Sequence, residues 1–154
     1  MIGKSKIMDQ KVSEYSCGAI VFKQFKKQIK VLLIKQINDV WNFPKGHMEN
    51  NETKLDTAHR EVFEETSIKD ITIYADKFYV DTYFVNRTGN WKEVTYFLAD
   101  TKTTSCPKKL LSEVKKVHFY PMKRALNILT YNKSKAFLKH AYKQYLNITN
   151  SKIK

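Results

Sequence analysis

Three glutamates on one predicted helix are the residues of this chain best suited to chemistry. Glu61, Glu64 and Glu65 have the spacing i, i+3 and i+4, so a helix would project them from one face, a turn apart. Like charges this close repel one another, and position 68, where a lysine would relieve them, is Ile. A hard divalent cation such as Mg²⁺ prefers oxygen ligands and would resolve the repulsion. The spacing therefore indicates a metal site, although a solvated acidic helix face is the plainer alternative.

The residues around these glutamates predict how they are presented. Leu55, Ala58 and Val62 form one apolar stripe, which predicts a helix over 54–66 that begins at Thr53 or Glu52. Because the stripe lies on another face, we expect the three carboxylates to lie outside the core. A polar loop is expected over 45–53. In that loop a glycine, residue 46, would let backbone carbonyls approach a metal because it has no Cβ.

The segment from Gly46 to Ile68 resembles the signature of the Nudix hydrolases. That signature reads Gly, five residues, Glu, seven residues, Arg-Glu, an aliphatic, any residue, Glu-Glu, any residue, Gly and an aliphatic. Its last glycine is Ser67 here, at the end of the predicted helix, where left-handed backbone is common. A serine there should cost about 1 kcal/mol of stability without removing a metal ligand. The residues that match are Gly46, Glu52, Arg60, Glu61, Val62, Glu64, Glu65 and Ile68.

The resemblance implies a Nudix-type α/β/α sandwich with a mixed β-sheet, and hydrolysis of a nucleoside diphosphate linked to another moiety. It implies that Mg²⁺, with Mn²⁺ as a substitute, polarises the phosphoryl oxygens and lowers the pKa of the attacking water. Arg60 and Glu52 would form an ion pair that holds the loop against the helix. The metal ligands carried over by position are Glu61, Glu64, Glu65 and the backbone carbonyl of Gly46.

A general base must still accept a proton from the water. Glu61 and Glu64 are candidates within the helix. Glu113 is a third, because many family members place a catalytic or metal-binding glutamate in the loop before a late strand. A solvated loop acid is the alternative reading of Glu113, and the sequence leaves the choice of base open.

The residues beside the signature indicate a substrate. Residues 41–49, WNFPKGHME, are similar to the W-x-x-P-K-G-H-x-E of asymmetric diadenosine tetraphosphate hydrolases, a branch of the family. This resemblance implies Mg²⁺-dependent hydrolysis of dinucleoside polyphosphates, with asymmetric cleavage to ATP and AMP. Lys45 and His47 would meet phosphate groups. Tyr96 and Tyr131 resemble the base-stacking tyrosines of that branch, although core packing would equally explain an aromatic residue.

Three other functions compete with this prediction. An RNA 5′-pyrophosphohydrolase is favoured by the net charge of +13. It is disfavoured by the Lys45-Gly46-His47 loop, because bacterial relatives that act on RNA tend towards Gln-Gly-Gly there. The second competing function is hydrolysis of another substrate that contains a linked nucleoside diphosphate. A non-catalytic nucleotide-binding module is the third, and it is disfavoured because the carboxylates are kept.

The rest of the chain predicts an α/β layered domain that positions these residues. Besides the helix over 54–66, we expect helices over 121–129 and 133–146, an extended piece over 41–44 and a turn over 87–90. The strands are expected over 15–22, 29–37, 71–74, 78–85, 91–99 and 117–120.

Length and composition bound the class of protein. The 154 residues, 42% hydrophobic and 28% charged, predict one globular domain with a core of about 12–147 and short flexible ends. No apolar run approaches the ~20 residues of a membrane span, and no secretory signal is evident, so a cytoplasmic monomer is expected. Two cysteines predict reduced thiols rather than a disulfide framework. The expected partner is a nucleotide; nucleic acid is less favoured, and no membrane is expected.

Overall fold

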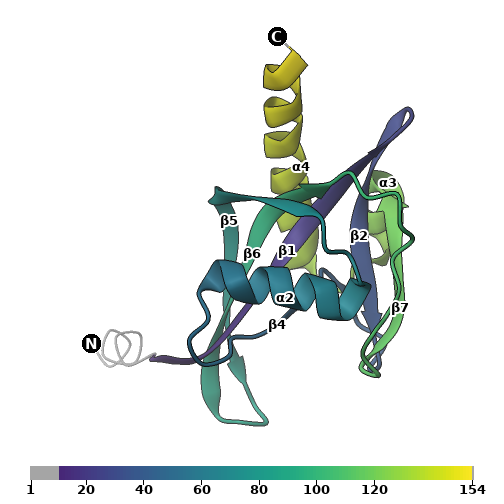
Figure 1. Cartoon of the computed structure of the whole chain (residues 1–154). Helices are drawn as coiled ribbons and strands as arrows, with labels where there is room; N and C mark the ends of the chain where they lie inside the picture. The colour runs from purple at the N-terminus through teal and green to yellow at the C-terminus, as the bar shows by residue number, and fades with distance from the viewer. Residues whose placement is uncertain (1–10, 154) are drawn as a thin grey trace.

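A mixed seven-stranded sheet forms the middle layer of the computed structural model, which describes residues 11–153 (Figure 1). Its main path is β3-β2-β1-β6-β5, while β4 also pairs with β1 and β7 with β2. β1 and β6 run parallel, and the other pairs are antiparallel. The strands are β1 (Val12–Phe25), β2 (Gln28–Gln36), β3 (Trp41–Asn42), β4 (Lys45–His47), β5 (Ile71–Val85), β6 (Asn90–Thr101) and β7 (Val114–Pro121).

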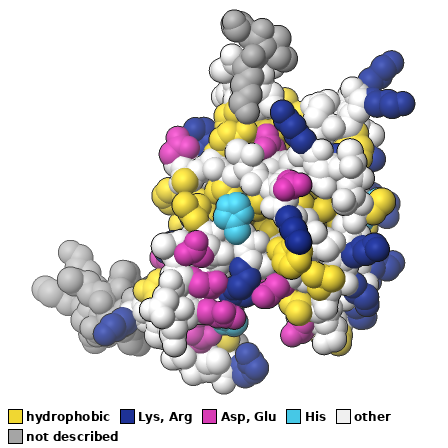
Figure 2. All heavy atoms as spheres, in the orientation of Figure 1, with side chains coloured by type: hydrophobic (Ala, Val, Ile, Leu, Met, Phe, Trp, Pro, Cys, Tyr) yellow, Lys and Arg dark blue, Asp and Glu magenta, His cyan; other side chains and the backbone are white. Residues whose placement is uncertain are grey.

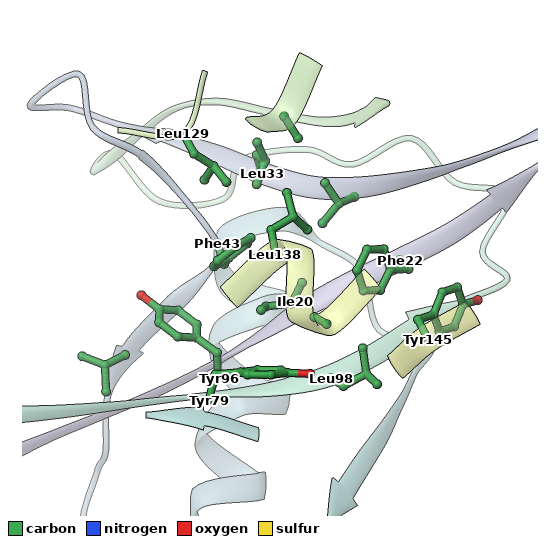
Figure 3. Close-up of a cluster of buried hydrophobic side chains, with 14 residues drawn as sticks. Ile20, Phe22, Leu33, Phe43, Tyr79, Tyr96, Leu98, Leu129, Leu138 and Tyr145 are labelled. Atoms are coloured by element: carbon green, nitrogen blue, oxygen red, sulfur yellow. The ribbon is translucent and has the colours of Figure 1, made fainter. Parts of the chain in front are cut away.

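Helices cover both faces of this sheet, which confirms the predicted α/β/α sandwich. In Figure 1, α2 (Lys54–Thr66) crosses the front of the sheet and α4 (Asn132–Ile153) lies behind it, with the short α3 (Met122–Ile128) beside β7. Alternate residues of β1 pack on opposite faces of the sheet, because successive side chains of a strand point to opposite faces. Ala19 and Val21 join the α2 side of the core, whereas Ile20 and Phe22 pack with Leu138 of α4 (Figure 3).

Most predicted elements are present, and the differences arise from pairing. The first part of the expected loop over 45–53 is the strand β4, because it pairs with β1 through Cys17 and Gly46. The two strands expected over 71–74 and 78–85 are one strand, β5, whose register shifts between Tyr74 and Phe78. At the C-terminus, the helix expected to stop at 146 continues to 153. The expected flexible N-terminal end lies mostly outside the described residues.

Helix α2 begins and ends as its sequence predicts, but its buried face is different. Thr53 is the N-cap, and it forms a capping box with Asp56. The expectation that the carboxylates avoid the core was wrong: Glu61 and Glu65 are only 8% and 7% exposed, whereas Leu55 of the apolar stripe is 36% exposed. The helix therefore turns two acids towards the sheet, and it does so beside β4.

Ser67 occupies the left-handed conformation that the signature glycine would adopt. Its φ is 62° and ψ is 9° at the C-cap of α2. Its hydroxyl oxygen accepts a bond from the backbone N–H of Lys108 at 3.1 Å, and the carbonyl of Thr66 accepts from the same N–H at 2.9 Å. The loop before β7 is thus tied to the end of α2 even where the residue type is unfavourable.

No helix within residues 11–153 combines the length and apolar character needed to cross a bilayer. Both cysteines are free, with Cys17 buried and Cys106 exposed.

Replacing Ser67 by Gly should raise the free energy of unfolding by about 1 kcal/mol, because glycine adopts positive φ without a Cβ clash. Urea denaturation measures the change. Ser67→Ala is the matched control: it removes the hydroxyl and keeps the Cβ, so it should bring no gain. A glycine variant no more stable than the alanine variant would contradict this account.

Candidate active site

Strand β4 and helix α2 approach so closely that only glycine fits between them. A Cβ added to Gly46 would lie 2.0 Å from Cδ of Glu61 and 2.2 Å from both carboxylate oxygens. The main chain of β4 therefore lies directly against a buried carboxylate. This agrees with the expectation that Gly46 lets the backbone approach the carboxylates. Burial raises the pKa of Glu61 above its ordinary value.

Glu65 is also buried against β4. Its Oε1 accepts a bond from the backbone N–H of Lys45 at 2.7 Å. Burial raises the pKa of this carboxyl to about 8, and the negative charges of Glu61 and Glu113 act in the same direction. Glu113, exposed in the turn before β7, is thus within electrostatic reach of the helix carboxylates. Glu64 is the most open of the three helix acids, with 37% of its side chain exposed.

A single guanidinium connects the helix to the chain before it. Arg60 makes a forked ion pair with Glu52, with Nε at 2.6 Å from Oε2 and Nη2 at 3.0 Å from Oε1. Nη2 also donates to the carbonyl oxygen of His47 at 2.9 Å. These bonds from Arg60 are the main reason that the pKa of Glu52 falls to about 2. The Arg60–Glu52 pair expected from the sequence is present in the structure.

The same arginine relieves the repulsion among the glutamates. Arg60 Nη1 lies 2.8 Å from Glu61 Oε1 and 3.1 Å from Glu64 Oε2. The cation that relieves them therefore precedes the acids in sequence, whereas the position after them, where a lysine was expected to be needed, is Ile68. Across the part of the chain that the structure describes, no three His, Cys, Asp or Glu side chains converge as a ready metal cluster.

The donor set nevertheless fits a hard cation. Glu61, Glu64 and Glu65 supply only oxygen atoms, and Gly46 lets the main chain of β4 lie close to Glu61 because no side chain intervenes. Burying a carboxylate without full compensation is unfavourable. Arg60 compensates Glu61, but Glu65 forms no ion pair among residues 11–153, so its charge lowers stability unless a cation joins it. Arg60 contacts only Oε1 of Glu61 and Oε2 of Glu64, so the second oxygen of each carboxylate could bind such an ion.

A cavity of about 450 Å³ lies on the other side of Lys45, which is one of its lining residues. Because Lys45 also binds Glu65 through its main chain, the cavity adjoins the carboxylate helix. Burial lowers the pKa of Lys45 despite the nearby carboxylates. Two of the lining residues form an ion pair: Lys133 Nζ at the start of α4 contacts Asp81 Oδ1 of β5 at 2.8 Å. Lys45 is the lining lysine that makes no ion pair with any residue among 11–153.

The tyrosines of the cavity differ in what they expose. Tyr131 is 51% exposed and Tyr83 is 37% exposed, so each offers ring surface to a ligand. Tyr96 lines the cavity but is only 3% exposed; its ring packs edge-on against Phe43, and its hydroxyl accepts from Asn42 Nδ2 at 3.2 Å. This placement favours Tyr131 as a stacking face and disfavours Tyr96. Tyr83 was not predicted from the sequence.

Neither His47 nor Lys92 is among the residues that line the cavity. His47 is exposed and faces Ser16 Oγ at 3.5 Å, and it is not among the lining residues. Lys92 is 9% exposed and makes no ion pair with any residue in 11–153. It lies opposite Tyr83 across β5 and β6, on the same face as Tyr96. The period of two along β6 was the only signal for it.

Comparison with known proteins agrees with the motif. A family model described as NUDIX domain matches residues 14–141. The asymmetrical bis(5′-nucleosyl)-tetraphosphatase of Mus musculus is 28% identical over 137 residues, which cover 82% of this chain and 92% of that protein. The m7GpppN-mRNA hydrolase of Saccharomyces cerevisiae is 28% identical over 132 residues, 84% of this chain but 12% of that protein. A crystal structure of a C. elegans Ap4A hydrolase binary complex has a TM-score of 0.78, with 24% identity and coverage of 88% and 98%.

The buried lysine of β6 predicts a pH-dependent stability. Burial lowers the pKa of Lys92 to about 8, against 10.5 for an unburied lysine. Below pH 8 the folded protein therefore holds an unfavourable buried charge. Between those two values the folded protein has lost the proton while the unfolded chain keeps it, so stability rises with pH.

Lys92→Met should therefore be more stable than the natural protein by about 1–2 kcal/mol at neutral pH, and the difference should shrink towards about pH 10. Denaturant unfolding at the two pH values measures it. Lys102→Met, at an exposed position, is the control for loss of charge alone. A difference that does not change with pH would refute the assignment.

Proposed function

The chain belongs to the Nudix family, and from that premise we propose that it hydrolyses dinucleoside polyphosphates, cleaving diadenosine tetraphosphate into ATP and AMP. The observation that supports this most is the position of Lys45. Its main chain binds Glu65 of the carboxylate helix, and its side chain lines the cavity. A phosphate chain held by Lys45 would therefore lie between a metal-binding helix and a nucleoside pocket.

Glu61, Glu64, Glu65 and the carbonyl of Gly46 are the proposed ligands of Mg²⁺, or of Mn²⁺ in its place. Family members generally depend on divalent cations. When bound, such an ion would polarise the phosphoryl oxygens, offset their charge and lower the pKa of the attacking water. The raised pKa of the buried Glu65 carboxyl falls once a cation is beside it, because an adjacent positive charge favours the ionised form.

The protein's own residues orient the reaction. Arg60, through its fork to Glu52 and its bond to the His47 carbonyl, holds the loop after β4 against α2. The general base needs an accessible carboxylate. Glu113 and Glu64 meet this requirement, since one is exposed and the other half-exposed, whereas Glu61 is buried. We therefore propose Glu113 or Glu64 as the group that accepts the proton of water.

Lys45, which lines the cavity, would neutralise the phosphate chain as a point charge. Lys92 does not line the cavity, but it lies within electrostatic reach of Lys45 and would add to the positive charge there. Tyr131, with Tyr83 nearby, would stack on an adenine. Stacking on an aromatic ring tolerates any base. The mouse relative is an asymmetrical tetraphosphatase by name, and the neighbouring worm structure is an Ap4A hydrolase, which supports this substrate over others.

An RNA 5′-pyrophosphohydrolase remains the second candidate function. The yeast m7GpppN-mRNA hydrolase has the same identity to this chain, 28%, as the mouse tetraphosphatase, but the match covers only 12% of the yeast protein. A substrate panel with 5′-triphosphate RNA, capped RNA and sugar nucleotides separates these activities. A non-catalytic binding module is disfavoured, because the three carboxylates and their supporting arginine are all in place.

Incubation of the protein with diadenosine tetraphosphate and Mg²⁺ should release ATP and AMP in equal amounts, as read by chromatography. Glu64→Gln should lower kcat by about a thousandfold, since metal-borne charge stabilisation is worth several kcal/mol. Glu93→Gln, a surface acid paired with Lys54, is the matched control and should stay active. Release of two ADP, no turnover, or an active Glu64→Gln variant would each reject part of the proposal.

Replacing Tyr131 by Ala should raise KM for diadenosine tetraphosphate by about 5- to 100-fold and leave kcat nearly unchanged, because a stacked base is worth ~1–3 kcal/mol. Tyr131→Phe keeps the ring and should behave like the natural protein. Tyr15→Ala, at an exposed tyrosine outside the cavity, controls for the loss of a surface aromatic. An unchanged KM in Tyr131→Ala would remove this residue from the site.

A further inference from the structure

The two exposed tyrosines of the cavity belong to elements that are far apart in the sequence. Tyr83 lies on β5 and points to the face of the sheet that α4 covers, because Tyr79, four residues earlier on the strand, packs there against Phe137. Tyr131 lies directly before α4, and its carbonyl oxygen accepts a bond from the backbone N–H of Lys135 at 3.1 Å. The separation of the two rings therefore depends on how β5 is held to the start of α4.

The start of α4 is fixed to β3, on one side of the cavity. The hydroxyl oxygen of Thr130 accepts a bond from the backbone N–H of Trp41 at 2.8 Å, and the Thr130 N–H donates to the Trp41 carbonyl at 3.2 Å. The hydroxyl of Ser134, which is buried, donates to Asn42 Oδ1 at 3.0 Å. Tyr131 lies between these two anchors in the sequence, so β3 sets its position.

Strand β5, on the other side, has fewer ties to α4. It is an edge strand, and among the described strands it pairs only with β6. Tyr79 contacts Phe137 and donates its hydroxyl to Gln144. After Tyr79, the ion pair of Asp81 with Lys133, at 2.8 Å, is the only hydrogen bond or ion pair within residues 11–153 that joins β5 to α4.

The ion pair lies two positions from each tyrosine. Asp81 and Tyr83 point to the same face of β5 because side chains alternate along a strand, and Lys133 follows Tyr131 by two residues. All four side chains line the cavity. Without the pair, Tyr131 would remain attached to β3, while Tyr83 would lie on an edge strand with no polar tie to the helix. The pair therefore limits how far the two rings can move apart.

We propose that Asp81 and Lys133 are positioning residues, which hold the rings of Tyr83 and Tyr131 at the separation that a bound nucleobase requires. The proposal rests on the proposed function, in which the cavity receives a nucleoside. The two side chains act on the base through the tyrosines and not by touching it.

The exposure of the pair sets the size of the expected effect. The Lys133 side chain is 56% exposed and that of Asp81 is 24% exposed. Ion pairs that solvent reaches contribute little to stability, so breaking this one should leave the fold intact. The dissociation constant of a nucleoside should change by about two- to fivefold.

Binding of adenosine, measured by isothermal titration calorimetry, tests the pair without hydrolysis and with a ligand that carries no charge. Asp81→Asn and Lys133→Gln should each raise Kd by about two- to fivefold. The exchanged pair, Asp81→Lys/Lys133→Asp, should restore the Kd of the natural protein, because the contact re-forms with its charges reversed. An unchanged Kd in either single variant, or an exchanged pair that binds no better than the single variants, would overturn the proposal.

A variant of Tyr83 tests whether the pair acts through this ring. Tyr83→Ala removes the ring whose position the pair controls, so adding Asp81→Asn to it should raise Kd no further. A further rise as large as that in the natural background would show that Asp81 contacts the base directly, and it would overturn the positioning role.

Lys54→Gln is the matched control, because it removes an ion pair of similar exposure. Lys54 Nζ lies 3.0 Å from Glu93 Oε2, and their side chains are 45% and 24% exposed. Lys54 belongs to α2, which crosses the face of the sheet drawn in Figure 2, whereas the cavity lies on the α4 face. Its Kd for adenosine should equal that of the natural protein, and an equal loss in this variant would refute a specific role for the cavity pair.

Hydrolysis of diadenosine tetraphosphate separates this proposal from the proposed function. In Lys133→Gln the loss of affinity should appear in KM, while kcat stays unchanged, because Lys133 is remote from the proposed metal ligands in α2 and β4. Adenosine binding that follows the pair, in a protein that does not cleave the dinucleotide, would uphold the positioning role and reject the substrate. Cleavage by a protein whose adenosine binding is indifferent to the pair would do the reverse.

Discussion

The forked ion pair between Arg60 and Glu52 is the contact on which the site depends. Arg60 lies on α2 and Glu52 lies in the loop after β4, so their bonds hold these two elements at a fixed separation. At that separation a Cβ on Gly46 would overlap Glu61. Lysine could not replace this arginine, because a single ammonium cannot form the fork to Glu52 and reach the His47 carbonyl, Glu61 and Glu64 as well.

Several ionisable side chains of the site are buried, and burial disfavours their charged forms. Glu61 and Glu65 face the sheet, and Lys92 is buried with no ion-pair partner in the described chain, so the folded protein carries acids with raised pKa and a base with lowered pKa within one region. Groups held in unfavourable surroundings are common where a ligand supplies a missing partner. Arg60 already pairs with Glu61, but Glu65 and Lys92 form no ion pair among residues 11–153. Glu65 therefore lacks a cation, and Lys92 lacks an anion.

The sequence predicted the local parts of this site and not the tertiary ones. The limits of α2, its cap at Thr53 and the left-handed residue Ser67 follow from spacing within a few residues. The burial of Tyr96 depends on Phe43 and Asn42, which lie more than fifty positions away, and no pattern in β6 reveals it. Lys92 was missed for the same reason. β4 looked like a loop because its strand partner, β1, lies far upstream. Propensity is a weak guide wherever such partners decide.

Charge is unevenly distributed along the chain. Acids concentrate between Asp39 and Glu113, the stretch that contains α2, while β2 and β7 border that stretch and contain only basic charged residues. The cations of these strands lie on both faces of the sheet: Lys30 shares the α2 face with Lys23 of β1, whereas Lys35 and Lys116 share the opposite face. An anion that approaches the molecule is therefore attracted by these strands and repelled by the carboxylates of α2, unless a cation offsets the helix carboxylates.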